Sequence, residues 1–222
     1  MNDKTFVSRR TILKGSLFVG AAATAGGSYS LTKGIAFAAD EPSADKAHES
    51  SVAQEGIQYG FLACPIKCTN CLKCIKACKR ANKTPDKIKE RRQVVSHTDS
   101  SGEEVFVPVS CMHCQNPSCA TACPAGAVTK RGDGIVVVDQ GLCIGCKYCY
   151  FACPFGIPQY SSEGMDKCDC CIGAGVPVGE MPNCVQACEF DALTFGTIDE
   201  LEAQYGTAKR LEAPTGPSLL LV

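Results

Sequence analysis

Residues 68–78 read CTNCLKCIKAC, a run that places cysteines at i, i+3, i+6 and i+10. The same spacing returns at residues 143–153, and a version with one longer gap lies at residues 111–123. A fourth run, at residues 168–188, keeps the closing CxxxC but carries a long insertion before it. In chain order these are motifs one to four, and they hold sixteen of the eighteen cysteines. Their members are Cys68, Cys71, Cys74 and Cys78; Cys111, Cys114, Cys119 and Cys123; Cys143, Cys146, Cys149 and Cys153; and Cys168, Cys171, Cys184 and Cys188.

This spacing is typical of cysteines that bind iron–sulfur clusters. Three thiolates three residues apart can wrap a loop around one corner of a 4Fe-4S cluster, whereas the cysteine at i+10 has already turned away. In two-cluster bacterial ferredoxins, that fourth cysteine ligates the cluster held mainly by the other run. The four motifs therefore predict four 4Fe-4S clusters, whose iron is bound by the sixteen motif cysteines with fourth ligands crossing between motifs.

Two other uses of clustered cysteines explain the pattern less well. Structural zinc takes four ligands in total, so a third cysteine three residues after a CxxC pair is surplus. Disulfide frameworks spread their cysteines to close long loops, whereas these lie too near one another to link distant segments. Outside the pattern, we expect Cys64 to lie near a cluster without binding it. We expect Cys170 to be a bystander, because the shared CxxC spacing selects Cys168 and Cys171.

Residues 1–39 are predicted to be a twin-arginine signal peptide. They contain Ser8-Arg9-Arg10-Thr11-Ile12-Leu13-Lys14, a mildly apolar stretch at residues 17–25, and Ala36-Phe37-Ala38 before the expected cleavage point. The apolar stretch is much shorter than the roughly twenty residues that span a membrane. Because this route exports proteins already folded around their cofactors, the cysteines would leave the cytoplasm as cluster ligands.

The signal implies a location in the periplasm or at the outer face of the cytoplasmic membrane. We expect the signal to be cleaved and to leave no membrane span; an uncleaved anchor is the alternative. Residues 40–56, rich in Ala, Ser and Glu, are predicted to form a flexible linker behind it.

Removal of the signal would make the chain acidic. The sequence has 22 basic and 23 acidic side chains, and residues 1–39 hold five basic and one acidic, which leaves 17 and 22. With anionic clusters added, this balance argues against nucleic-acid binding. Basic residues do crowd residues 67–92, where charge compensation around clusters, a partner surface or a solvated face would each explain them.

The sequence between and after the motifs indicates small repeated units. Residues 127–130 and 134–138 flank Gly132-Asp133-Gly134, which is a hairpin signal. A turn followed by an apolar segment recurs after three closing cysteines, at residues 124–128, 154–158 and 189–193. Motifs two and three are close enough in sequence to close one unit locally, so motifs one and four would pair around it.

We therefore predict an α+β fold of two nested ferredoxin-like units, each binding two 4Fe-4S clusters, loop-rich with few short strands and helices. The outer unit would comprise residues 57–103 plus 161–198, and the inserted inner unit residues 104–160. Residues 199–222 would form a C-terminal helix and a loose tail. Thr197-Ile198-Asp199-Glu200 is a capping-box pattern that would start this helix. The apolar end at residues 219–222 is expected either to be disordered or to dock on a partner.

The four motifs in this order, with Cys123-Pro124, Cys153-Pro154, the junction at residues 134–143 and the PNCVQAC run at residues 182–188, resemble a known family. It comprises the four-cluster electron-transfer beta subunits of molybdopterin oxidoreductases, such as dimethyl sulfoxide, polysulfide, thiosulfate and tetrathionate reductases. The resemblance covers about residues 57–198 and is specific because it requires all these features together.

The resemblance implies how the cysteines share the clusters. The four implied ligand sets are Cys68, Cys71, Cys74 and Cys188; Cys78, Cys168, Cys171 and Cys184; Cys111, Cys114, Cys119 and Cys153; and Cys123, Cys143, Cys146 and Cys149. Some relatives replace one motif-three cysteine and hold a 3Fe-4S cluster there, whereas this chain keeps all four. Lys79 and Glu189 depart from ferredoxins, which often have proline at those positions, but neither change removes a ligand.

The resemblance also implies a relay that passes electrons between a membrane quinone-interacting subunit and an exported molybdopterin catalytic subunit, without bond chemistry of its own. One alternative is the same relay serving a periplasmic cytochrome nitrite reductase or hydrogenase. Another is a stand-alone iron–sulfur enzyme.

The histidines do not suggest a catalytic set. His113 follows the loop of motif two, and we expect it beside a cluster or in solvent rather than as a ligand. His97 lies in a predicted loop and His48 in the predicted linker. No phosphate-binding glycine fingerprint, CxxCH haem site or nucleophile elbow is present in the sequence.

Overall fold

The computed structural model describes residues 56–99 and 101–222. The predicted signal peptide, His48 and all of the predicted linker except Gly56 lie outside these residues. Within the described ranges, no helix is both long and apolar enough to cross a membrane.

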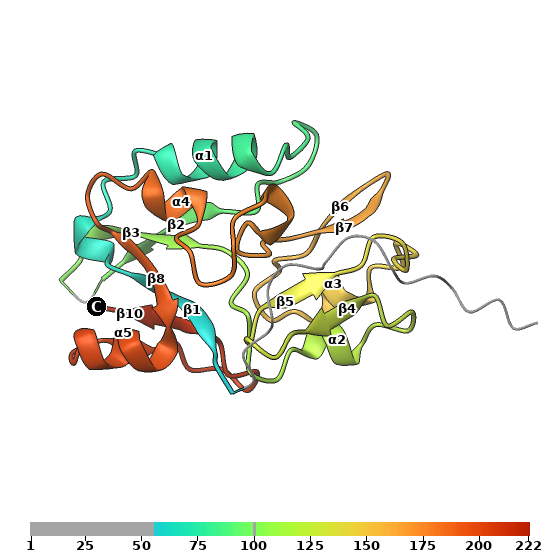
Figure 1. The fold of residues 1–222 in the computed structure, drawn as a ribbon. Helices are drawn as coiled ribbons and strands as arrows, with labels where there is room; N and C mark the ends of the chain where they lie inside the picture. Colours follow the sequence, from blue (N-terminus) through green and yellow to red (C-terminus); the bar gives the residue numbers. More distant parts are fainter. Residues whose placement is uncertain (1–55, 100) are drawn as a thin grey trace, which may run out of the picture. The chain divides into compact units, whose positions relative to one another are not determined.

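A four-stranded sheet joins segments from the two ends of the described chain (Figure 1). Its order is β8-β1-β10-β9, where β1 is Tyr59–Ala63, β8 is Leu193–Thr197, β9 is Lys209–Arg210 and β10 is Leu219–Leu221. β1 pairs antiparallel with β8 and parallel with β10, so that Phe61 stands opposite both Phe195 and Leu219. β9 pairs antiparallel with β10. β1 is therefore a central strand with a partner on each side.

The side chains of β1 are buried on both faces of this sheet. Phe61 and Ala63 pack into a core that contains motif cysteines, whereas Leu62 packs with Ile198 and Leu220 on the other face. The exposed fractions of Phe61, Leu62 and Ala63 are 2%, 1% and 0%. A short continuous apolar run is what a strand covered on both faces requires.

The prediction of a loose C-terminal tail is wrong, because residues 219–221 form β10 inside the sheet. Leu219 joins the core that holds the cysteines and Leu220 packs on the opposite face. The Ser218 N–H donates to the Met112 carbonyl at 2.8 Å, which fixes the approach of β10 beside motif two. A run of four apolar residues after a proline carries too little pattern to predict a strand; the partner strand β1 determines its structure.

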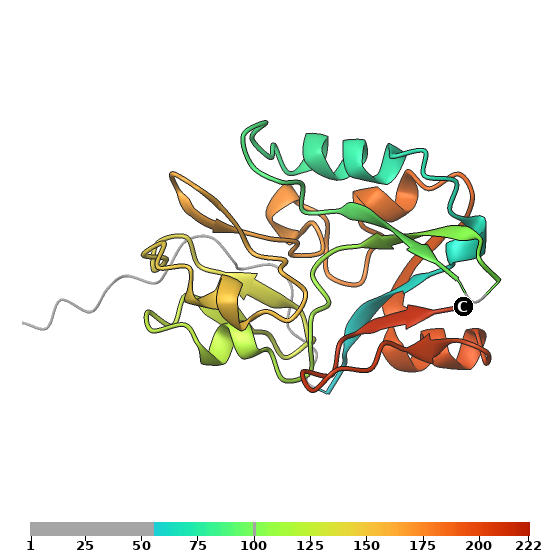
Figure 2. The ribbon, with the colours of Figure 1, turned by 180° about the vertical axis from the view of Figure 1, so that it is seen from behind.

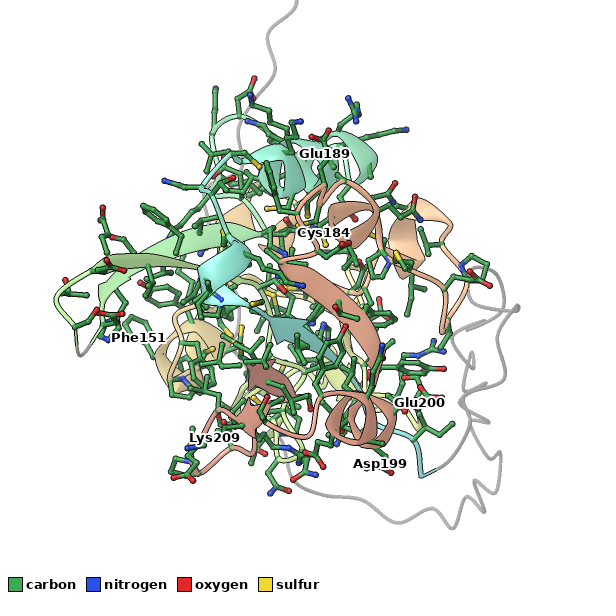
Figure 3. All side chains as sticks on the ribbon, turned by 90° about the vertical axis from the view of Figure 1, so that its left-hand side faces the viewer. Phe151, Cys184, Glu189, Asp199, Glu200 and Lys209 are labelled. Atoms are coloured by element: carbon green, nitrogen blue, oxygen red, sulfur yellow. The ribbon has the colours of Figure 1, made fainter. Side chains whose placement is uncertain are left out.

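Helix α5 (Ile198–Gln204) covers the face of the sheet that carries Leu62. The Glu200 N–H donates to the Thr197 hydroxyl at 3.2 Å, and the Thr197 N–H donates to the Glu200 carboxylate at 3.3 Å. The predicted capping box is therefore confirmed, with Asp199 and Glu200 at the start of the helix (Figure 3). Ile198 and Leu201 are buried against the sheet, and Tyr205 packs beside them.

Each motif contains one short helix. These helices are α1 (Lys73–Ala81), α2 (Ser118–Thr121), α3 (Tyr148–Ala152) and α4 (Asn183–Gln186). Each holds the third cysteine of its motif, and the closing cysteine follows four residues later, about one helical turn along the axis. Helix α1 contacts α4, and α2 contacts α3. The packing thus joins motif one to motif four, and motif two to motif three (Figure 1).

Three two-stranded hairpins complete the regular structure. They are β2–β3 (Gln93–Thr98 and Glu104–Val109), β4–β5 (Val128–Lys130 and Val136–Val138) and β6–β7 (Gln159–Ser161 and Gly164–Asp166). The β4–β5 hairpin was predicted and is confirmed, with Val128 opposite Val138. Short 3-10 helices lie at Pro65–Lys67 (η2) and Ile172–Ala174 (η3).

The loop predicted around His97 is wrong, because His97 lies in β2 opposite Val105 of β3. The polar run around it has weak strand propensity, and pairing with β3 overrides that propensity. Seen from behind, the β2–β3 hairpin lies between α1 and the four-stranded sheet (Figure 2).

Candidate functional site

Motifs one and three form the same local loop. The residues on either side of the second cysteine have positive φ in both: 53° at Asn70 and 61° at Leu72, and 67° at both Gly145 and Lys147. Left-handed backbone is uncommon for residues other than glycine and is adopted where the surroundings require it. Because left-handed residues recur at equivalent positions, the CxxCxxC runs of motifs one and three have the same loop conformation.

The first group of sulfurs, site 1, comprises Cys68, Cys71, Cys74 and Cys188. All four line one small cavity that is partly open to solvent and whose wall also includes Val94 and Leu193. Burial raises the pKa of the Cys74 thiol, and the neighbouring Cys188 and Cys68 thiolates raise it further. Four sulfurs around an otherwise apolar cavity form a donor set suited to a soft metal centre.

Site 2 comprises Cys78, Cys168, Cys171 and Cys184, all of which are buried; Cys184 is labelled in Figure 3. Burial raises the pKa of the Cys78 thiol strongly, and the Cys168, Cys184 and Cys171 thiolates add to the effect. The Asn82 amide donates to the sulfurs of Cys78 and Cys171, each at 3.7 Å. Site 2 thus joins the closing cysteine of motif one to three cysteines of motif four.

Site 3 comprises Cys111, Cys114, Cys119 and Cys153. Burial, followed by the charges of Cys111, Cys153 and Cys114, raises the pKa of Cys119 to about 12, although nearby Lys167 opposes this shift. Burial and then Cys153 also act to raise the pKa of Cys114. The closing cysteine of motif three therefore lies with three cysteines of motif two.

Site 4 comprises Cys123, Cys143, Cys146 and Cys149. Cys123 and Cys143 pack against Cys149 in one core cluster. Burial raises the pKa of the Cys149 thiol, with further contributions from the Cys123 and Cys146 thiolates.

Hydrogen bonds reach the sulfurs of Cys149 and Cys143 in site 4. The Tyr160 hydroxyl lies 2.8 Å from the Cys149 sulfur, and the Met165 N–H donates to the Cys143 sulfur at 3.4 Å. Both partners come from the β6–β7 hairpin, which thereby holds this group in place.

The four sites follow one another in a row. The charge of Arg92 acts on sulfurs of both site 1 and site 2. The Cys168 thiolate of site 2 raises the pKa of Cys111 in site 3. Cys119 of site 3 and Cys149 of site 4 belong to one packed cluster. Each site therefore has a neighbour in the order 1, 2, 3, 4.

The chemistry of these groups fits bound iron–sulfur clusters. Burial, followed by neighbouring thiolates, raises the pKa of at least one cysteine at each site, so four thiolates in one buried place are unfavourable without a cation. Metal binding deprotonates thiols and contributes that cation. All eighteen cysteines are free thiols, so every motif cysteine can serve as a ligand.

Cys170 and His113 lie between sites 2 and 3. His113 is fully buried; its Nδ1 accepts a hydrogen bond from the Val136 N–H at 3.0 Å, and its Nε2 lies 3.3 Å from the Cys170 sulfur. The ligand atoms of His113, Cys168 and Cys170 all lie within 4.8 Å of one another. His113 is thus beside a cluster site and away from solvent. Cys64 is buried at the start of η2, where its N–H donates to the Ala192 carbonyl at 2.9 Å.

Two buried cations, Arg92 and Lys167, were not singled out from the sequence. Arg92 ends a basic stretch and stands before the apolar pair Val94-Val95, and Lys167 directly precedes Cys168. Adjacency to a ligand cysteine or to an apolar pair is the only local signal that marked them. A solvated face also accounts for part of the basic stretch at residues 67–92, since Lys79 forms an ion pair with the exposed Asp86.

The sequence matches two family models that share the description "4Fe-4S dicluster domain", one over residues 67–127 and one over residues 102–198. Together the two matches include all four motifs. The protein is 41% identical over 162 residues to the B subunit of the anaerobic dimethyl sulfoxide reductase of Escherichia coli (strain K12), which covers 67% of this sequence and 78% of the relative.

Two further relatives have comparable coverage. The thiosulfate reductase electron transfer subunit PhsB of Salmonella typhi is 37% identical over 153 residues, or 66% of this sequence and 80% of the relative. Protein NrfC of Escherichia coli (strain K12) is 34% identical over 166 residues, or 72% and 74%. This protein therefore belongs to the family of iron–sulfur electron-transfer proteins that includes the B subunits of dimethyl sulfoxide reductases and the thiosulfate reductase electron transfer subunit.

Proposed function

We propose that this chain relays single electrons through a row of four 4Fe-4S clusters, between a membrane quinone-interacting subunit and an exported molybdopterin catalytic subunit. The observation that carries the proposal is the grouping of the sixteen motif cysteines into sites 1 to 4, each of which combines two motifs. When bound, 4Fe-4S clusters supply one-electron chemistry at potentials that their protein surroundings set.

In this proposal each site contributes four thiolates to one cluster, and the closing cysteine of every motif belongs to the neighbouring site. Motifs one and four form an outer unit of residues 57–103 and 161–198 around an inner unit of residues 104–160. The contacts of α1 with α4 and of α2 with α3 support this nested arrangement.

Exposure at the two ends of the row supports transfer to and from other chains. Cys71 of site 1 and Cys146 of site 4 are exposed, whereas site 2 is buried throughout. Exposed apolar side chains lie close to both ends: Phe190 lines the cavity of site 1, and Phe151 stands in motif three with 81% of its surface exposed (Figure 3). In motif three Phe151 is joined by exposed Ile144, Tyr148 and Tyr150, and grouped exposed apolar side chains are typical of protein–protein contact surfaces.

The metals that co-purify with the chain test the partner. Molybdenum and pterin in the isolated complex are expected. Multihaem absorption or nickel would instead favour a cytochrome nitrite reductase or a hydrogenase as the partner. Export by the twin-arginine route is part of the proposal, and replacement of Arg9 and Arg10 by lysine should leave the full-length precursor in the cytoplasm.

The number of clusters is tested by iron and acid-labile sulfide measured on anaerobically purified protein. Four cubane clusters give about sixteen irons per chain. A count near eight, or stoichiometric zinc, would contradict the four-cluster assignment.

The crossed ligands give a sharper prediction. Cys188 lies in motif four but belongs to site 1, so Cys188→Ser should change the same electron paramagnetic resonance signal as Cys71→Ser. It should not change the signal that Cys171→Ser alters at site 2. A single ligand loss is expected to convert one cluster to a 3Fe form or to remove it, with a loss of about one to four irons.

The matched control is Cys64→Ser, which removes a buried cysteine outside the four sites. It should retain the full iron content. If Cys188→Ser reproduces the spectrum of Cys171→Ser instead, the pairing of motifs is wrong even if the iron count is right.

A further inference from the structure

Among the lysine and arginine side chains of the described residues, those of Arg92 and Lys167 are buried, with exposed fractions of 1% and 4%. Neither forms an ion pair with a carboxylate in the part of the chain that the structure describes. Burial of an uncompensated charge is strongly unfavourable. Each side chain therefore requires an anionic partner of another kind.

Arg92 lies where sites 1 and 2 meet. Its Nη2 donates to the Cys184 sulfur of site 2 at 3.3 Å, and its Nη1 donates to the Pro108 carbonyl at 3.4 Å. The guanidinium carbon stands over the Phe61 ring, 4.4 Å from its centre, in a cation–π contact. Its Nε is buried without a hydrogen-bond partner.

Pro108, whose carbonyl accepts from Arg92, lines the cavity of site 1, so the guanidinium lies beside both sites. It acts to lower the pKa of Cys74 in site 1, and of Cys78 and Cys184 in site 2, against the larger effect of burial. The guanidinium is thus shared between two groups of thiolates, and it is anchored by an aromatic ring and a backbone carbonyl that carry no net charge.

Lys167 lies between sites 2 and 3. Its Nζ donates to the backbone carbonyl of Val136, which packs in one cluster with Cys119 of site 3, and to the carbonyl of Cys168 of site 2. Its charge acts to lower the pKa of Cys111 and Cys119, both of site 3. Its hydrogen-bond partners are thus neutral carbonyls, and none is a carboxylate.

We propose that Arg92 is a positioning residue that acts as a fixed counter-charge shared by the clusters of sites 1 and 2, raising the reduction potential of both, with Lys167 in the same role at site 3. This inference rests on the four-cluster function proposed above. Reduction adds one negative charge to a cluster, so a nearby cation in a medium of low dielectric constant stabilises the reduced form more than the oxidised form. Because Arg92 lies between two sites, its effect should extend to both and should not reach site 4.

The test is a potentiometric titration followed by electron paramagnetic resonance on the full chain carrying Arg92→Gln. The one-electron reduction equilibrium of the clusters at sites 1 and 2 should each shift about tenfold toward the oxidised form, which corresponds to about 59 mV. The clusters at sites 3 and 4 should shift less than twofold. Lys167→Met should instead shift site 3 and leave site 1 unchanged, so the two variants together separate a local charge effect from a general disturbance.

Arg92→Lys keeps the charge but loses the planar guanidinium. Its clusters at sites 1 and 2 should therefore show less than half of the potential shift seen in Arg92→Gln. Arg210→Gln, which removes an exposed cation paired with Glu202, is the surface control and should shift no cluster. Equal potentials in Arg92→Gln and the unmodified chain would overturn the proposal, as would a uniform shift of all four clusters.

Iron content separates this proposal from the proposed function. A wild-type count far from about sixteen would refute the four-cluster relay itself. If Arg92→Gln loses the clusters of sites 1 and 2 while Arg92→Lys retains them, a positive charge is required there, as proposed. If both variants lose those clusters and keep the others, shape rather than charge is what Arg92 supplies, and the proposal is wrong.

Discussion

The Tyr160 hydroxyl is one of the few side-chain groups outside the motifs that touch a motif sulfur. It lies 2.8 Å from the Cys149 sulfur, and burial followed by this contact raises the pKa of Tyr160. The hydroxyl therefore stays protonated at neutral pH, and it would donate to this sulfur when Cys149 is the thiolate ligand of a cluster. Hydrogen bonds to cluster sulfurs are among the factors that set reduction potentials.

Tyr160→Phe removes this donor and leaves the ring. A neutral hydrogen bond contributes about 1 kcal/mol net, so the reduction equilibrium of the cluster at site 4 should shift about fivefold toward the oxidised form. Redox titration followed by electron paramagnetic resonance measures the shift. Tyr148→Phe, at a side chain that is 60% exposed, is the matched control. A shift at any site other than site 4 would be at odds with this contact.

At the scale of elements, Gly60 allows β1 to pack between its neighbours. A Cβ at this position would lie 2.4 Å from the Ser218 carbonyl oxygen and 2.5 Å from the Ile198 Cδ1 atom. The Ser218 oxygen accepts the Phe61 N–H at 3.0 Å, so it cannot move without loss of that hydrogen bond. The close approach of α5 and the segment before β10 thus depends on a residue without a side chain.

Gly60→Ala is expected to lower the free energy of unfolding by about 3 kcal/mol, because overpacking of a rigid core costs about 1–3 kcal/mol and here one contact is backbone. Anaerobic denaturant titration of the iron-loaded protein gives the value. Gly206→Ala is the control, since a Cβ there meets nothing within 4 Å. Equal stability of the two variants would show that the sheet adjusts freely around β1.

Elements with local signals were predictable, and those held by distant partners were not. The β4–β5 hairpin follows from the turn at residues 132–134, and the start of α5 follows from the Thr197 and Glu200 capping box. By contrast, β10 and the strand at His97 depend on pairing with β1 and β3, which no short-range pattern in their own sequences encodes.

At the scale of the whole described chain, the largest core cluster is built partly from cysteine. Cys74, Cys78, Cys111, Cys168, Cys170 and Cys184 are buried members of it, together with Phe61 and Ile135. Without iron these positions bring together thiols and two buried cations, so much of the core has no favourable packing of its own. Metal binding and folding are then a single equilibrium.

Removal of the iron by an anaerobic chelator should therefore unfold the chain. We expect the free energy of unfolding to fall by more than about 5 kcal/mol, which is the whole stability of a small domain. Far-UV circular dichroism and amide hydrogen exchange measure the loss, and reconstitution with iron and sulfide is the control. A cooperative unfolding transition that survives in the iron-free protein would show that the apolar residues are sufficient.

The candidate sites illustrate what cysteine spacing can and cannot predict. The i+10 position predicts that each closing cysteine leaves its own loop, and the proposed ligand sets of sites 1 to 4 rest on that crossing. Spacing does not encode charge compensation. Arg92 and Lys167 are recognisable only once the chain has folded, because their anionic neighbours come from motifs far along the sequence.

The parallel pairing of β1 with β10 also orders events during synthesis. β1 leaves the ribosome early, but the strand that completes its hydrogen bonding on one side is made much later. At ribosomal rates of about 5–20 residues per second, roughly 10–30 s separate the two. During most of that interval Phe61, Leu62 and Ala63 have no partner strand, since β8 is also made late. A nascent chain is therefore open to mispairing along β1 until translation reaches β10, and a holdase that covers residues 59–63 during this interval would raise the yield of folded protein.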